Sequence, residues 1–256
     1  MYNAVTRIYI TNVRRAFTAI GATLPKPVLK AMDDEGKLRT AERDLAGVGD
    51  SQIAAAIAEC VLAGRDPAAD ETVRHVLMAR QITQHASGLP SVAEARVTEA
   101  MAAHVDQMLA PLIAASTKAG VALVTAQDVA GGIEDPAILI SKGGAAVEAW
   151  NAGREAEKLL RTLDTAWTSL AELTRFATAS ADPVLRIADI DLAGHEKVRH
   201  TPSPTKIVRH GGTITLADAE VYAARVQRLA DGRTARTRQS EQDFKSAFNP
   251  SLRART

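Results

Sequence analysis

The segment from Lys197 to His210, KVRHTPSPTKIVRH, has the side chains best suited to contact an anionic partner. Val-Arg-His occurs twice in it, and from Lys197 to Ala217 there are four basic residues and no acidic one. Lysine and arginine side chains bind carboxylates and phosphates. Because Pro202 and Pro204 interrupt helix formation, we expect a two-stranded ribbon or an irregular arm here.

Further arginines extend this basic group toward the C-terminus. Residues 195–256 contain 12 Lys and Arg against 6 Asp and Glu, whereas residues 1–194 contain 19 against 24, so the net charges are +6 and −5. Such asymmetry indicates a region that meets an anionic partner. The predicted partner-binding residues are Lys197, Arg199, Lys206, Arg209, Arg233, Arg236 and Arg238.

Two kinds of partner fit these residues. One is an acidic protein surface, which another copy of the chain can supply. The other is the backbone of a nucleic acid, whose binding depends on such charges. Tyr222 is the one aromatic residue near the basic group, whereas proteins that bind single strands place several rings among their basic residues. The protein partner is therefore preferred, and nucleic acid is kept as the alternative.

The histidines and the single cysteine do not form a recognisable metal or catalytic motif. His195, His200 and His210 lie near acidic residues, but H-E-x-x-H is absent and one cysteine cannot form a thiolate cluster. Cys60 lies on the apolar face of an expected helix, where a buried thiol is inert. G-x-S-x-G, a P-loop and G-x-G-x-x-G are also absent. We therefore predict no enzyme activity, no metal and no cofactor.

Apolar residues recur at spacings of three and four along most of the chain, which predicts amphipathic helices. The strongest pattern runs from about Gly144 to Thr178, and others cover approximately 3–21, 28–46, 50–64, 66–88, 91–119 and 215–232. Asp66 is expected to cap its helix, and Pro111 is expected to kink or break the run that contains it. The tail after residue 232 has few apolar residues and is expected to be extended.

The predicted fold class is mostly α. A multi-helix bundle over residues 1–180 is followed by a basic C-terminal arm over 195–256, comprising a short hairpin, one helix and an extended tail. Much of the apolar content is alanine, and there are only nine aromatic residues. Alanine-rich helices bury little area per residue, so self-association is expected to stabilise the chain.

Taken together, the sequence predicts a non-enzymatic structural or assembly protein. It self-associates through its helices and docks a neighbour through its C-terminal arm, as a phage head-assembly, connector or scaffold-like component would. The alternative is a nucleic-acid-associated regulator that uses the basic 195–256 region. No signal peptide or membrane span is recognised, so a cytoplasmic location is expected, or the virion if the chain is of phage origin.

Overall fold

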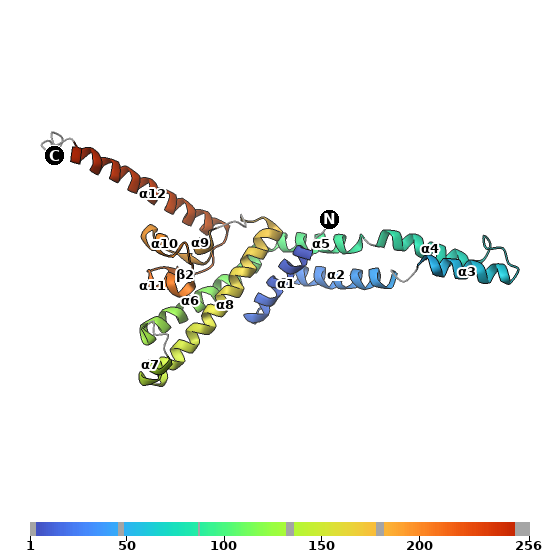
Figure 1. Ribbon diagram of the computed structural model, residues 1–256, viewed down its shortest axis with the longest axis horizontal. Helices are drawn as coiled ribbons and strands as arrows, with labels where there is room; N and C mark the ends of the chain where they lie inside the picture. The colour runs from blue at the N-terminus through green and yellow to red at the C-terminus, as the bar shows by residue number, and fades with distance from the viewer. Residues whose placement is uncertain (1–3, 46–48, 87, 132–135, 178–181, 249–256) are drawn as a thin grey trace. The chain divides into compact units, whose positions relative to one another are not determined.

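The computed structural model describes residues 4–45, 49–86, 88–131, 136–177 and 182–248 (Figure 1). Within these ranges it contains twelve helices and one antiparallel pair of two-residue strands. The predicted mostly α fold class is confirmed. The elements are α1 (Ala4–Ala19), α2 (Lys26–Leu45), α3 (Asp50–Leu62), α4 (Glu71–Ala86), α5 (Leu89–Ala103), α6 (Val105–Ala130), α7 (Pro136–Ser141), α8 (Gly144–Thr174), α9 (Pro183–Ile187), β1 (Ala188–Asp189), α10 (Leu192–Val198), α11 (Pro204–Arg209), β2 (Thr213–Ile214) and α12 (Ala219–Phe248).

The contacts between residues divide the chain into two compact units. Unit 1 comprises residues 1–10 and 24–105, and unit 2 comprises residues 11–23 and 106–256. This division differs from the predicted one, which separated 1–180 from 195–256. The C-terminal region belongs to the same unit as α6 and α8, because α9 to α12 supply part of that unit's core.

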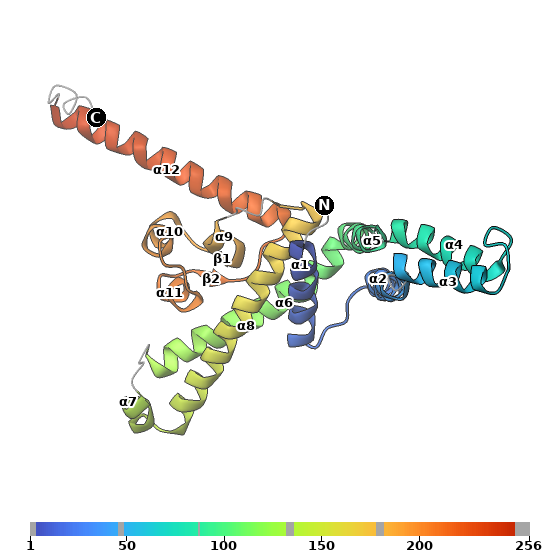
Figure 2. The ribbon, with the colours of Figure 1, turned by 45° about the vertical axis from the view of Figure 1, so that its right-hand side comes forward.

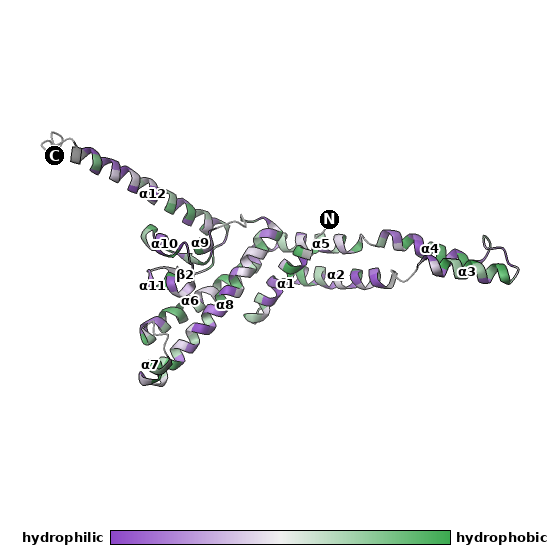
Figure 3. Ribbon diagram, in the orientation of Figure 1, coloured by the Kyte–Doolittle hydropathy of each residue, from purple (hydrophilic) through white to green (hydrophobic). Residues whose placement is uncertain are grey.

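In unit 1, α2 packs against α5 and α3 packs against α4. The first pair encloses apolar side chains that include Val28, Met32, Val97 and Met101. The second pair buries far less: the buried residues of α3 and α4 are Cys60, Val73 and Ala86. Hydrophobic residues recur along the ribbon of α3 and α4 (Figure 3). Several of them have exposed side chains: Ile57, Val61, Leu62, Leu77, Met78 and Ile82.

The start of α4 differs from the prediction. Asp66 and Pro67 precede the helix, and Asp66 Oδ1 accepts a hydrogen bond from the amide of Ala68 in the turn before it. Asp70 is the residue that caps α4, since its Oδ1 accepts hydrogen bonds from the amides of Thr72 (3.0 Å) and Val73 (3.1 Å). The carboxylate satisfies two of the amides that a helix start leaves without partners.

In unit 2, α6 and α8 run side by side (Figures 1 and 2). Their close approach depends on glycine, because a Cβ on Gly153 of α8 would lie 2.7 Å from that of Ala126 in α6. Of the kink or break expected at Pro111, the break does not occur there. The helix passes through Pro111, and the interruption falls at His104, whose Nδ1 lies 2.9 Å from the carbonyl oxygen of Ala100.

By length and composition, α6 is the one helix of the described residues that could cross a membrane. Its buried residues include Met108, Leu112 and Leu123, and its Ser116 Oγ accepts a hydrogen bond from the amide of Leu216 at 2.8 Å. These are the contacts of a helix in a folded core. That the chain has no membrane span stays a prediction.

Trp167 of α8 lies at the centre of unit 2 and is fully buried. Its indole N–H donates to the carbonyl oxygen of Ala217 at 2.6 Å, and its ring packs against those of Phe176 and Tyr222. Arg186 lies over the same ring and donates to both carboxylate oxygens of Asp164, at 2.9 and 3.0 Å. This cluster ties α8 to α9 and to the segment that leads into α12.

The segment from Lys197 to His210 is not a ribbon. It contains the end of α10 and all of α11, and the paired strands lie on either side of it, with Ala188 opposite Ile214 and Asp189 opposite Thr213. Pro204 does not prevent α11, because it occupies the first turn, where its missing N–H has no role in the helix. Ser203 caps that turn by accepting a hydrogen bond from the amide of Lys206.

The region after Gly232 is also helical rather than extended. α12 continues without interruption from Ala219 to Phe248, a length of 30 residues. Its glutamines and carboxylates form supporting pairs four residues apart, Gln227 with Asp231 and Gln239 with Asp243. The rest of the predicted tail, residues 249–256, lies outside the described residues.

Candidate functional site

The seven predicted partner-binding residues all belong to unit 2. Lys197 lies on α10, Arg199 directly follows it, Lys206 and Arg209 lie on α11, and Arg233, Arg236 and Arg238 lie on α12. All seven side chains are exposed. Arg209 differs from the other six, because it alone lines a pocket between α6, α8 and α11, which is described below.

Glu196 of α10 brings three of the seven residues together. Arg236 donates two hydrogen bonds to its carboxylate, at 2.8 and 2.7 Å. The pKa of Glu196 is lowered, first by the hydrogen bond from Arg236 and further by the charges of Arg236, Arg199 and Arg233. One carboxylate thus faces three arginines, and the cluster keeps a net positive charge.

Two of the seven basic residues, Arg199 and Lys206, also contact polar groups nearby. Arg199 Nε donates to Nε2 of His200 at 3.0 Å, and Lys206 Nζ donates to Oγ1 of Thr201 at 2.9 Å. Neither contact neutralises the positive charge. Both side chains remain available to an anionic group.

The distal half of α12, residues 233–248, contacts α10 through Arg236, which pairs with Glu196. The proximal half is anchored by Arg225, which is buried, and by Leu229. From Arg233 to Lys245 every side chain is exposed, including Phe244 at 63%. This part of the helix carries Arg233, Arg236, Arg238 and Lys245 against Glu241 and Asp243.

The three histidines near the basic segment are not gathered around one point. His195 is buried, and its Nε2 lies 2.8 Å from Oδ2 of Asp182, whereas His200 is exposed and contacts Arg199. No group of three or more His, Cys, Asp or Glu suited to a metal ion occurs in the described residues. Cys60 is buried as predicted, and burial raises the pKa of its thiol, with a further contribution from the charge of Asp70.

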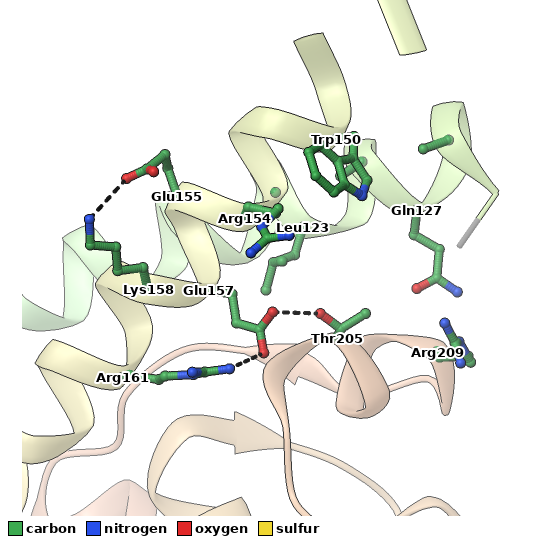
Figure 4. A pocket seen from close by; sticks show the side chains of 13 residues that line it. Leu123, Gln127, Trp150, Arg154, Glu155, Glu157, Lys158, Arg161, Thr205 and Arg209 are labelled. Atoms are coloured by element: carbon green, nitrogen blue, oxygen red, sulfur yellow. Dashed lines mark hydrogen bonds and ion pairs between the residues drawn. The ribbon is translucent and has the colours of Figure 1, made fainter. Parts of the chain in front are cut away.

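A pocket with a volume of about 780 Å³ lies between α6, α8 and α11 (Figure 4). Leu123, Ala126 and Ala130 of α6, with Gly153 of α8, supply its apolar surface. Trp150 and Gln127 lie toward one end, where Arg209 enters from α11, and Arg154 lies nearer the middle, beside Leu123 (Figure 4). The guanidinium of Arg154 lies 4.9 Å from the centre of the Trp150 ring.

The carboxylates in this pocket are already paired. Glu155 lies 4.0 Å from Lys158, while Glu157 accepts hydrogen bonds from Arg161 at 3.0 Å and Thr205 at 3.5 Å. Two further cations, Arg154 and Arg209, have no carboxylate partner in the described part of the chain. The pocket therefore carries a surplus of positive charge.

Apart from Arg209, the residues of this pocket were not predicted from the sequence, although α8 shows a signal for them. Trp150, Arg154, Lys158 and Arg161 recur at spacings of four, four and three, which place them along one face of a helix. The opposite wall could not be anticipated, because α11 lies about fifty residues further along the chain and was expected to form part of a ribbon or an irregular arm.

No protein-family model, curated protein or solved structure matches this chain.

Proposed function

We propose that the protein is a non-enzymatic assembly subunit that self-associates and docks onto a second copy of itself through the distal half of α12. The single observation that supports this most strongly is the exposure of every side chain from Arg233 to Lys245 within one continuous helix. The distal half of α12, residues 233–248, extends about 24 Å along the helix axis. The helix thus offers a long surface to a neighbour.

The stability of isolated helices favours a docking role for this segment. In water, helices shorter than roughly 12–15 residues are marginal, and most helical stability in proteins comes from packing of one face. From Arg233 to Lys245 no side chain is buried among the described residues. A partner that packs against the arginines of this segment would add the buried face.

Charge supports a second copy as the partner. The distal half of α12 is positive, whereas residues 1–194 have a net charge of −5. The apolar side chains left exposed on α3 and α4, such as Leu62 at 87% and Met78 at 63%, favour association as well. The wider role of a phage head-assembly, connector or scaffold-like component agrees with such a subunit and rests on architecture alone.

A charge-reversal experiment tests this proposal. Arg233→Glu with Arg238→Glu should raise the concentration needed for self-association in light scattering, because both side chains are exposed and would then repel acidic surfaces. The matched control is Arg14→Glu with Arg15→Glu, an equal charge change on exposed residues of α1.

Equal behaviour of the wild type and of both double variants would reject α12 as the docking element. The alternative, a nucleic-acid-associated regulator, would replace it if the protein stayed monomeric and bound duplex DNA. That binding should weaken steeply with salt and be lost in the α12 variant.

A further inference from the structure

The pocket between α6, α8 and α11 combines features that are uncommon on a surface built only for assembly. Its volume of about 780 Å³ lies within the range of roughly 300–1,000 Å³ typical of small-molecule sites. One part of its lining is apolar, from Leu123, Ala126 and Ala130, and cationic side chains stand at its edge (Figure 4). Such a pocket suits a ligand with an apolar part and a charged part.

The charges specify the charged part. Glu155 and Glu157 are paired with Lys158 and Arg161, so Arg154 and Arg209 account for the surplus positive charge. These two arginines come from different elements, α8 and α11, and enter the pocket from different walls. A guanidinium presents a planar fork of donors that fits phosphate oxygens. A phosphate group with several oxygens is the anion that two such forks hold best.

Gln127 specifies a second feature of the ligand. Its Oε1 is buried and has no hydrogen-bond partner among the described residues, although it lines the same pocket. A buried acceptor without a partner costs free energy. Rotation of the Gln127 side chain, which is itself only half-buried, would turn this oxygen into the pocket, where a hydroxyl or amino group on the ligand would satisfy it.

We propose that this pocket binds a small phosphorylated organic molecule, with Arg154 and Arg209 contacting the phosphate and Gln127 accepting a hydrogen bond from the organic part. A nucleoside diphosphate carries all three features: adjacent phosphates, donor groups, and an apolar ring for the lining of α6. This site is separate from the distal half of α12. The inference does not depend on the assembly role.

Isothermal titration of the full chain with ADP and with inorganic pyrophosphate tests the proposal. Both should bind, and ADP should bind more tightly because it also contacts Gln127 and the apolar lining. Trp150 lines the pocket whereas Trp167 is buried in the core. ADP should therefore change the tryptophan emission of the wild type and leave that of Trp150→Phe unchanged.

Substitutions locate the site. Arg154→Gln and Arg209→Gln should each weaken binding of both probes about tenfold or more, since a hydrogen bond to a charged group is lost. Gln127→Leu should weaken ADP and leave pyrophosphate unchanged. Arg96→Gln, the same change at an exposed residue of α5 in unit 1, is the matched control and should bind as the wild type does.

Three results would overturn the inference. One is the absence of saturable binding tighter than about 1 mM for both probes. Another is equal weakening by Arg96→Gln, which would indicate nonspecific attraction. The third is equal affinity for ADP and pyrophosphate with no effect of Gln127→Leu, which would exclude an organic ligand. Arg154 and Arg209 are both exposed, so unchanged circular dichroism is expected in their variants.

Discussion

At the residue scale, unit 2 depends on a buried cation whose role is structural. Arg225 of α12 is 3% exposed, and its Nη1 donates to the carbonyl oxygens of Leu185 (2.8 Å) and Thr215 (3.1 Å). Burial lowers the pKa of its guanidinium, while the nearby charge of Asp189 opposes that shift. The side chain joins the α9 and β2 segments to the proximal half of α12.

Removing this guanidinium should destabilise unit 2. Arg225→Leu leaves the carbonyl groups of Leu185 and Thr215 without their donor, and the expected loss in the free energy of unfolding is about 2–4 kcal/mol. The control is Arg228→Leu, which removes an exposed ion pair with Asp189 (2.8 Å) and should cost less than about 1 kcal/mol. Urea denaturation followed by circular dichroism measures both, and equal effects would contradict this role for Arg225.

A second residue-scale prediction concerns pH and Asp70. The pKa of this carboxyl is lowered, first by the hydrogen bond from the amide of Val73 and then by the charge of Arg65. A carboxyl whose pKa is lower in the folded state stabilises that state above its unfolded pKa of about 3.9, and this contribution is lost as the pH falls through the folded value.

The wild type should therefore be more stable than Asp70→Asn at neutral pH, and the difference should shrink as the pH falls below about 4. Denaturant unfolding of both proteins across this pH range is the measurement. A difference that does not change with pH would show that Asp70 acts through its neutral hydrogen-bonding capacity alone.

At the element scale, glycines allow α6 to approach its neighbours. A Cβ added to Gly120 would lie 2.7 Å from Cβ and 2.8 Å from the carbonyl oxygen of Ile214 in β2. Because backbone atoms cannot move aside easily, Gly120→Ala should lower the free energy of unfolding by about 1–3 kcal/mol.

The matched control for this change is Gly36→Ala inside α2, where nothing lies within 4 Å of the added carbon. Alanine forms helices better than glycine, so this variant should gain up to about 1 kcal/mol. Thermal unfolding of the two variants should thus shift in opposite directions. A shift of Gly120→Ala toward higher temperature would contradict the close packing of α6 against β2.

The sequence predicted long amphipathic helices better than it predicted short elements. The stripe through Leu160, Leu163, Trp167 and Leu170 is buried in α8 as its spacing of three and four requires. Pro204 misled the prediction because a proline in the first turn of a helix and a proline that breaks one look alike in sequence. The α4 cap was assigned to Asp66 rather than Asp70 because both residues are aspartates, and an aspartate at either position can cap a helix.

The candidate sites were predictable only in part, because the sequence shows which residues share a helix but not which helices pack together. Charge counting identified Arg233, Arg236 and Arg238, which lie on one helix and need no tertiary contact to act together. The pairing of Arg236 with Glu196 depends on folding that brings residues forty positions apart into contact. The same holds for the pocket that Arg154 and Arg209 share.

At the scale of the whole molecule, we expect association to use particular apolar residues. Leu62→Ser with Met78→Ser should weaken self-association with little effect on stability, because both side chains are largely exposed. Ile140→Ser, which changes a side chain 69% exposed on α7, is the control and should leave association unchanged. Analytical gel filtration over a range of concentrations compares the oligomeric state of these variants. An equal effect of the control would indicate nonspecific hydrophobic association.

The contacts of unit 2 decide where the chain can be shortened without loss of the fold. Ending it near Gly194 would remove Ala217 and Arg225, and with them the partner of the Trp167 indole and the donor to Leu185. Ending it at Gly232 keeps these contacts and removes the exposed distal half of α12. The shorter chain should therefore keep its thermal stability.

Sedimentation velocity of the full chain beside the chain ending at Gly232, over a range of concentrations at low salt, tests the central proposal most directly. The full chain should form oligomers whose weight-average sedimentation coefficient rises with concentration, and the shortened chain should sediment as a smaller species. Identical sedimentation of the two chains at every concentration would contradict docking through the distal half of α12.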